Sequence, residues 1–129
     1  MTVEQDDYAK GAQTLIKLVG DARAEAVMAR FRQLSPAFEN EAISVVFGRT
    51  WSRTAIDAKT RSLCSVGILA ALGRHGALKI VFGIALKSGA TVDEIIESLL
   101  QVAIYAGYPA ALDALPLLAD VLKEIDAAE

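Results

Sequence analysis

Apolar residues recur at intervals of three or four along the chain, and no run alternates with a period of two for long. Near the N-terminus, for example, one face of a helix would carry Tyr8, Ala12, Leu15, Ile16 and Val19. Only three prolines interrupt the chain. This pattern predicts an all-α fold of six or seven helices.

Residues that cap helices mark where several of these helices should begin. Ser35 is an expected N-cap, because Pro36 follows it at the first helical position, where the missing N–H costs nothing. Asp57 is the expected N-cap of a later helix. Thr91 and Glu94 have the spacing of a capping box.

The caps, the glycines and the apolar spacing together give the expected helix bounds. The expected helices cover residues 4–19, 22–34, 36–48, 57–73, 76–87, 91–106 and 110–126. Pro116 lies inside the last of them. We expect a kink or a break there, because proline removes a helical hydrogen bond and crowds the preceding turn.

The helix expected over residues 57–73 is apolar on every face in its second half. A helix of this kind is expected to be central and buried. It carries the single cysteine, Cys64, among Leu63, Val66 and Ile68. We therefore expect Cys64 to be a buried, chemically inert packing group.

The size and composition of the chain predict one domain that buries some of its surface against other copies. A chain of 129 residues is long enough for one domain, over residues 1–129, with a substantial core. Its hydrophobic content of 53% and mean hydropathy of +0.37 are high for a small protein. The alternative to a homo-oligomer is an unusually apolar monomer.

Charge and apolar run length exclude several classes of partner. The formal net charge is −3, and no basic run interleaved with aromatic residues suggests nucleic-acid binding. The longest apolar stretches, over residues 63–73 and 80–86, are far shorter than the roughly 20 residues of a membrane span. The first ten residues are acidic and polar, without an apolar targeting segment. We expect a cytoplasmic protein.

Four sequence elements carry a resemblance to a known family. They are Gly48, Trp51 and Arg53 in a GxxWxR pattern, the DxxTRSL segment over residues 57–63, ALGR over 71–74 and VAIYAGYPAA over 102–111. The chain resembles the carboxymuconolactone decarboxylase family, whose members are small all-helical proteins related to the alkylhydroperoxidase-D-like reductases. The resemblance is close over about half of the chain and weaker over DYAKGAQ and LVGDA, residues 7–13 and 18–22.

The resemblance implies a fold, an assembly and a reaction. It implies an alkylhydroperoxidase-D-like helical fold and a ring-like assembly, a trimer or a hexamer built from trimers. The implied activity is that of a lyase in the degradation of aromatic compounds. It would act without a metal or an organic cofactor on a small unsaturated carboxylic acid or lactone.

The reductase branch of the superfamily uses a CxxC pair followed by a histidine after the ALG turn. Here His75 and Leu78 stand at the approximate cysteine positions. Because disulfide exchange needs a second, resolving thiol, a thiol-peroxidase function is close to excluded.

Decarboxylation of a lactone needs a cation for the remaining carboxylate, delocalisation of the developing charge and a general acid for the new carbanion. Family members commonly carry a glutamate in a GExW element and a histidine after the ALGR turn. By resemblance, Arg49 and Val81 stand at these two positions. The alternative function is therefore that of a diverged member that binds a small anion without decarboxylating it. A titratable group directed into the main cavity would favour the lyase.

The candidate substrate-binding residues are mostly arginines. Arg49, Arg53 and Arg61 lie within thirteen residues around Trp51, and arginine suits bidentate binding of a carboxylate. The alternatives to anion binding are structural roles: helix capping, pairing between subunits and an ion pair of Arg61 with Asp57 four residues earlier.

Three further polar residues complete the candidate site. His75, the only histidine, and Tyr105 are candidate catalytic residues, and Gln101 is a candidate binding residue on a largely apolar helix. The alternatives are an exposed histidine without a role in a turn and a tyrosine that only packs. No metal ligand set is expected.

Overall fold

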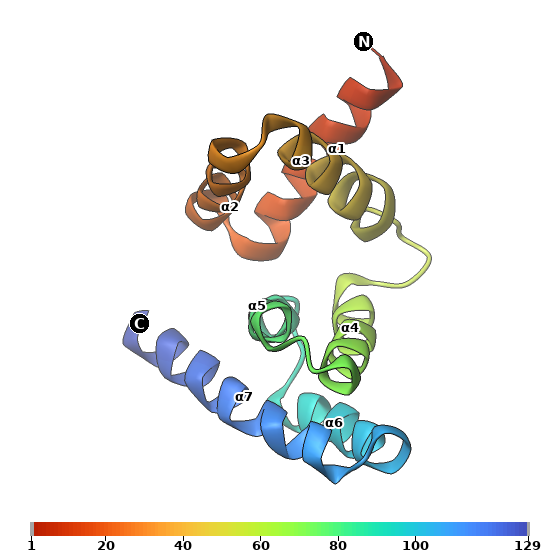
Figure 1. Cartoon of the computed structure of the whole chain (residues 1–129), viewed down its shortest axis with the longest axis vertical. Coiled ribbons are helices and arrows are strands. Elements are labelled where there is room, and N and C mark those ends of the chain that lie inside the picture. The colour runs from red at the N-terminus through yellow and green to blue at the C-terminus, as the bar shows by residue number, and fades with distance from the viewer. Residues whose placement is uncertain (1, 129) are drawn as a thin grey trace. The chain divides into compact units, whose positions relative to one another are not determined.

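The computed structural model describes residues 2–128, with the exception of the side chain of residue 4, and among these residues it contains α-helices, one π-helical segment and no strand (Figure 1). The all-α prediction is confirmed. The elements are α1 (Val3–Val19), α2 (Asp21–Leu34), α3 (Pro36–Glu41), η1 (Ala42–Trp51), α4 (Ala58–Leu72), α5 (His75–Lys87), α6 (Val92–Ala106) and α7 (Tyr108–Ala128).

The described residues form two compact units, one ending at Ile56 and the other beginning at Asp57. The first unit holds α1, α2, α3 and η1, and the second holds α4 to α7. The prediction of one domain over the whole chain stays a prediction. Within the part of the chain that is described, none of the helices is both long and apolar enough to span a membrane.

The first unit is organised around the packing of α1 against η1, which are close neighbours over much of their length. The buried side chains of its core are Leu15, Ala24, Met28 and Ile43. These residues come from α1, α2 and η1, so the apolar face predicted for the first helix does form one side of this core.

Two glycines let the backbones of α1 and η1 come close together. A Cβ atom on Gly11 would overlap the carbonyl oxygen of Ile43, and one on Gly48 would overlap the carbonyl oxygen of Asp7. Any larger residue at either position would have to push the two helices apart. The glycines therefore fix the distance between α1 and η1.

The prediction of one α-helix over residues 36–48 is wrong in the type of helix and in the residue where it ends. Only α3 is α-helical, and the chain continues as the π-helical η1 to Trp51. At its end, the N–H of Ser52 donates to the carbonyl oxygen of Phe47, five residues earlier, across 3.1 Å. Local sequence preference does not specify this five-residue hydrogen-bond spacing. In this protein the π-helical segment is also the one whose backbone lies against α1.

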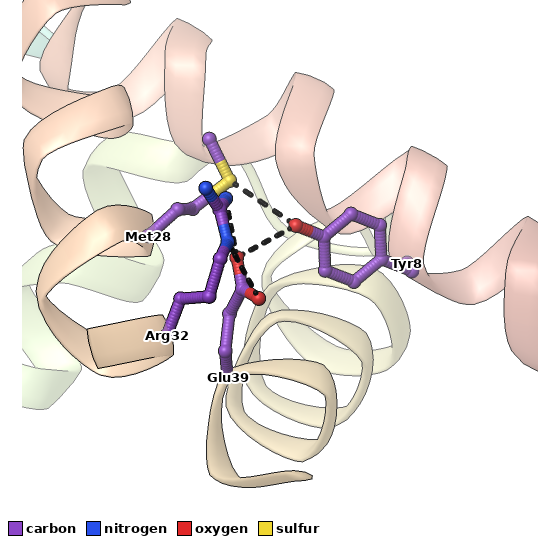
Figure 2. A network of polar contacts seen from close by, with 4 residues as sticks. All are labelled: Tyr8, Met28, Arg32 and Glu39. Atoms are coloured by element: carbon purple, nitrogen blue, oxygen red, sulfur yellow. Dashed lines mark hydrogen bonds and ion pairs between the residues drawn. The ribbon is translucent and has the colours of Figure 1, made fainter. Parts of the chain in front are cut away.

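A polar network ties α1, α2 and α3 together (Figure 2). Glu39 is 6% exposed and accepts hydrogen bonds from the Tyr8 hydroxyl at 2.9 Å and from Arg32 Nη2 at 2.8 Å. The Tyr8 hydroxyl also lies 3.8 Å from the sulfur of Met28. Because every member has a partner, this buried carboxylate is tolerated in an otherwise apolar region.

The network shifts the titration of its members. The hydrogen bond from Arg32, followed by the bond from Tyr8, lowers the pKa of Glu39 below its ordinary value despite the burial of the carboxylate. Burial and then the hydrogen bond to Glu39 raise the pKa of the Tyr8 phenol. Glu39 is therefore ionised and Tyr8 neutral at neutral pH.

In the second unit, α4 packs against α5, α6 and α7 (Figure 1). The large buried side chains at the centre of its core include Val66, Leu78, Phe82, Ile95 and Leu99. The predicted caps are confirmed at both places. Asp57 Oδ1 accepts from the N–H of Thr60 at 2.8 Å, and Thr91 and Glu94 form the capping box.

α4, expected to be central and buried, contacts the other three helices of the second unit but is buried along one stripe only. Its fully buried residues are Ser62, Val66 and Ala70, which lie four apart on a single stripe. Ile68 and Leu72 are 58% and 64% exposed in the single chain. The neighbouring helices cover only part of α4, so its remaining apolar surface is left without a partner in the described residues.

Pro116 does not break the last helix, since α7 runs without interruption from Tyr108 to Ala128. Pro116 and Leu112 are both exposed. The carbonyl of Leu112, which loses its helical donor to proline, therefore lies on a side of the helix that water can reach.

Candidate functional site

The first unit contains a cavity of about 600 Å³ at the end of η1. Its walls come from α1, from the last residues of η1 and from the segment that follows. We call it the cationic cavity, and the residues that line it are Asp7, Lys10, Gly48, Arg49, Ser52, Arg53, Thr54 and Ala55.

Among the described lining residues of the cationic cavity are three cations and one carboxylate, so positive charge prevails in the described lining. Arg49 Nε donates to Asp7 Oδ2 across 2.7 Å, so one of the cations is already paired with the carboxylate. Among residues 2–128, neither the amine of Lys10 nor the guanidinium of Arg53 has an ion-pair partner. These two groups are available to an anion from solution.

The local structure explains why these side chains meet. Asp7 and Lys10 are three residues apart on α1 and share one face of the helix. Gly48 brings η1 against the backbone of Asp7, and Arg49 follows directly. The Ser52 hydroxyl donates to the carbonyl oxygen of Gly48 at 2.6 Å and closes the end of the π-helical segment. Interruptions of α-helical bonding of this type are frequent at functional sites.

The second unit contains a different cavity, of about 420 Å³, between α4 and α6. We call it the apolar cavity. Its lining residues are Thr60, Leu63, Cys64, Gly67, Ala71, Ser98, Gln101, Val102, Tyr105 and Ala106. Of its polar groups, the Ser98 hydroxyl is already used, because it donates to the carbonyl oxygen of Glu94 at 3.1 Å. The described lining carries no charged side chain.

The model of the carboxymuconolactone decarboxylase family matches residues 36–120 of the chain. The chain belongs to the carboxymuconolactone decarboxylase family. The match begins in α3 and ends in α7, so it includes η1 and most of the cationic cavity but not Asp7 or Lys10.

Similar proteins include two decarboxylases. The chain is 27% identical over 122 residues to the 4-carboxymuconolactone decarboxylase of Acinetobacter baylyi, over 95% of this chain and 91% of the relative. It is 32% identical over 71 residues to the nitrosuccinic acid decarboxylase of Metarhizium robertsii, over 54% of this chain and 48% of that one. An uncharacterised 15.0 kDa protein of Paracoccus denitrificans is 29% identical, over 91% of this chain and 89% of the relative.

Arg49 and Val81, which by the resemblance stand where the family commonly has an acid and a histidine, lie in different units. Arg49 is exposed and bound to Asp7. Val81 is 8% exposed and belongs to the core of the second unit, beside Phe82. An aliphatic side chain packed in a core cannot take part in proton transfer.

The structure brings together only some of the predicted binding residues. Arg49 and Arg53 line the cationic cavity, whereas Trp51, half-buried at the end of η1, is not part of its lining. Arg61 lies on α4 in the second unit, and its Nε atom is buried without a hydrogen-bond partner among residues 2–128. The alternative pair with Asp57 is not present among the described ion pairs, because that carboxylate caps α4 instead.

The remaining candidates lie in the second unit. Gln101 and Tyr105 line the apolar cavity, and Tyr105 is 84% exposed. His75 is the exposed first residue of α5 and lines neither of these two cavities. Catalytic roles for His75 and Tyr105 and binding roles for Trp51, Arg61 and Gln101 stay predictions.

The prediction that Cys64 is buried is wrong. Its side chain is exposed and lines the apolar cavity. Only one stripe of α4 is buried, and Cys64 lies beside the stripe formed by Ser62 and Val66 rather than on it.

Sequence reasoning missed Asp7 and Lys10. The available signal was their spacing of one helical turn directly before Gly11, inside the DYAKGAQ segment that resembles the family weakly. Among the side chains that the structure describes, no three from His, Cys, Asp or Glu lie close enough together to hold a metal ion.

Proposed function

We propose that this chain is a cofactor-independent lyase that removes carbon dioxide from a small unsaturated carboxylic acid or lactone. We propose further that the cationic cavity binds the substrate. The observation that carries this proposal is the excess of positive charge in the described lining of the cavity, where Lys10 and Arg53 have no ion-pair partner among the described side chains.

The size and charge of the cationic cavity suit such a substrate. About 600 Å³ lies within the range of about 300–1,000 Å³ that is typical of small-molecule sites. The planar guanidinium of Arg53 can bind a carboxylate through two parallel hydrogen bonds. Arg49, already oriented by Asp7, presents a second guanidinium in the same cavity.

The relatives support the reaction class and the kind of substrate. Two of the similar proteins are named as decarboxylases, one for 4-carboxymuconolactone and one for nitrosuccinic acid. Both compounds are small and carry a carboxylate. A shared scaffold that acts on both is consistent with loss of carbon dioxide from a compact anion.

Titratable groups in the cavity favour a lyase over a passive anion-binding protein. Asp7 and Lys10 line the cavity together with the arginines, so the site is not limited to permanent cations. The departures at Arg49 and Val81 favour the alternative, because they remove the acid and the histidine that the family commonly carries. The alternative, a diverged member that binds the anion without decarboxylating it, is therefore the second outcome of the test.

The test measures steady-state decarboxylation of 4-carboxymuconolactone, followed by its ultraviolet absorbance, and of nitrosuccinate, followed by release of carbon dioxide. We expect the wild type to turn over at least one of them. Arg53→Gln should lower kcat/KM by about ten- to a hundredfold, since a charge-assisted contact contributes about 1.5–3 kcal/mol. Arg30→Gln is the matched control, because Arg30 is an exposed arginine of the first unit outside the cavity.

Three results would argue against the proposal. Binding of both probes without turnover would favour the anion-binding alternative. Turnover that is unchanged in Arg53→Gln would mean that the cationic cavity is not the site. Equal losses in Arg53→Gln and Arg30→Gln would mean that the effect reflects the net charge of the protein.

A further inference from the structure

Loss of carbon dioxide leaves an electron pair on carbon, and that carbon must receive a proton. The bond between this carbon and the carboxylate carbon breaks, the electron pair stays with the substrate and delocalises into its unsaturated body, and carbon dioxide leaves. One proton is then consumed for each carboxylate lost. A site for this reaction therefore needs a proton donor inside the cavity.

The lining of the cationic cavity contains few possible donors. Gly48 and Ala55 have no side-chain proton to give, and a guanidinium does not lose its proton in proteins. Asp7 Oδ2 accepts a hydrogen bond from Arg49 Nε at 2.7 Å, so this side chain is already engaged as an acceptor.

The two hydroxyl groups of the lining are also unsuitable. The proton of Ser52 is committed to the carbonyl oxygen of Gly48 at 2.6 Å. Thr54 is a neutral alcohol, and an alcohol is a poor acid at neutral pH.

We propose that Lys10 is the catalytic proton donor of the cationic cavity, an inference that rests on the proposed function. Its ammonium group carries three protons and has no ion-pair partner among residues 2–128. When it protonates the substrate carbon, Lys10 becomes a neutral amine, which recovers its proton from water before the next turnover.

The position of Lys10 on α1 suits this role. Lys10 immediately precedes Gly11, where α1 lies against the backbone of Ile43, and it lines the cavity together with the last residues of η1. The charged groups that line the same cavity are Asp7 from α1, Arg49 from η1 and Arg53 from the segment after it. The arginines can hold the substrate carboxylates while the flexible stem of Lys10 brings its amine to the carbon.

Tyr8, another weak acid of α1, is already engaged. Tyr8 donates its proton to Glu39 at 2.9 Å and does not line the cavity. Its raised pKa, caused first by burial, keeps that proton in place. Of the described α1 residues that line the cavity, Lys10 is thus the one with a proton to give.

The test separates the charge of Lys10 from its ability to give a proton. Lys10→Arg keeps a cation but not a dissociable proton, so with the better of the two probes we expect KM within about threefold of the wild type. We expect kcat to fall by about 10²–10⁴, which is the usual contribution of a general acid or base. Lys17→Arg is the matched control, since Lys17 is exposed on α1 outside the cavity.

A second variant gives an independent readout. Lys10→Ala should lose turnover and regain part of it when methylammonium is added. Tetramethylammonium, which has the same charge but no N–H proton, should not restore it. Lys10 is exposed, so neither substitution removes a core contact, and unchanged circular dichroism would confirm folding.

The outcomes distinguish this proposal from the proposed function. If the wild type turns over a probe and Lys10→Arg does so equally fast, Lys10 is not the donor although the lyase function stands. Equal rescue by methylammonium and tetramethylammonium would likewise overturn proton donation. If the wild type itself turns over neither probe, both the proposed function and the role of Lys10 are contradicted.

Discussion

Arg49 Nε donates to Asp7 Oδ2 across 2.7 Å and so joins the end of η1 to α1 within the cationic cavity. This ion pair has two opposing consequences for an anionic ligand. It orients one guanidinium, and it also places a negative charge among the cations of the site. The affinity of the cavity for carboxylates should therefore respond to Asp7 as well as to the arginines.

Asp7→Asn should strengthen binding of a carboxylate such as benzoate. Two like charges about 4 Å apart in water repel by about 1 kcal/mol, which corresponds to about a fivefold lower Kd once Asp7 is neutral. Calorimetric titration of benzoate measures this change, and Asp6→Asn is the control, because Asp6 is exposed and outside the cavity lining. Weaker binding by Asp7→Asn would show that orienting Arg49 matters more than the repulsion.

The network around Glu39 should make the stability of the protein depend on pH in the acid range. The pKa of Glu39 is lowered by folding from its ordinary value of about 4.5, first by the hydrogen bond from Arg32. Folding thus favours the ionised form. Its contribution to the free energy of unfolding is complete above that ordinary value and is lost as the pH falls through the lower, folded-state pKa.

Chemical denaturation of the wild type and of Glu39→Gln between pH 7 and pH 3 tests this dependence. The difference in unfolding free energy between the two should shrink as the pH falls. Tyr8→Phe should cost about 1 kcal/mol at pH 7 through loss of one hydrogen bond. Tyr108→Phe should cost less than half of that, since Tyr108 is exposed. A pH-independent difference between wild type and Glu39→Gln would contradict the assignment.

Gly11→Ala and Gly48→Ala should both destabilise the first unit. Each new methyl group would overlap a carbonyl oxygen of the facing helix, and forced overpacking typically costs about 1–3 kcal/mol. Gly67→Ala is the control, because a Cβ atom there would meet nothing within 4 Å. That variant should gain about 0.5–1 kcal/mol from the helix propensity of alanine. Thermal unfolding that ranks all three alike would show that α1 and η1 do not pack closely.

Local signals in the sequence were enough to predict much of the secondary structure. The caps at Ser35, Asp57 and Thr91 act within three residues of the helices that they begin, so they could be recognised in the sequence. The π-helical type of η1 could not be predicted from local sequence. It occurs where η1 meets the backbone of α1, at Gly11 and Ile43, which are far apart in the chain.

The candidate site was predictable only in part, for the same reason. Arg49 and Arg53 lie four residues apart and could be grouped from sequence alone. The partner of Arg49 is 42 residues away, and nothing local indicates that Asp7 and Lys10 share its cavity. The error about Cys64 is different, since the apolar composition of α4 indicates burial without saying whether the same chain or another copy provides it.

We expect the protein to form a homo-oligomer, a trimer or a hexamer. The large apolar side chains that the second unit exposes support this expectation, and they include Ile68, Leu72, Ile80, Leu100, Ile104, Leu112 and Leu115. Light scattering should give three or six times the chain mass of 13.7 kDa.

A charge on the exposed surface of α6 tests where the copies meet. Ile104→Asp should lower the mass, whereas Leu34→Asp, at an exposed position of the first unit, should not. A wild-type mass near 13.7 kDa at micromolar concentration would contradict the assembly.

The most direct test of decarboxylation in the cationic cavity follows the carboxylate carbon itself. 4-Carboxymuconolactone labelled with ¹³C at the carboxylate that is lost is mixed with excess protein, and labelled carbon dioxide and bicarbonate are measured by nuclear magnetic resonance. The 4-carboxymuconolactone decarboxylase of Acinetobacter baylyi is the positive control. We expect slower release by the wild type than by the control, since by the resemblance Arg49 and Val81 stand where the family commonly has an acid and a histidine. We expect still slower release by Arg53→Gln. No labelled carbon dioxide from the wild type, or equal release from Arg53→Gln, would contradict decarboxylation at this site.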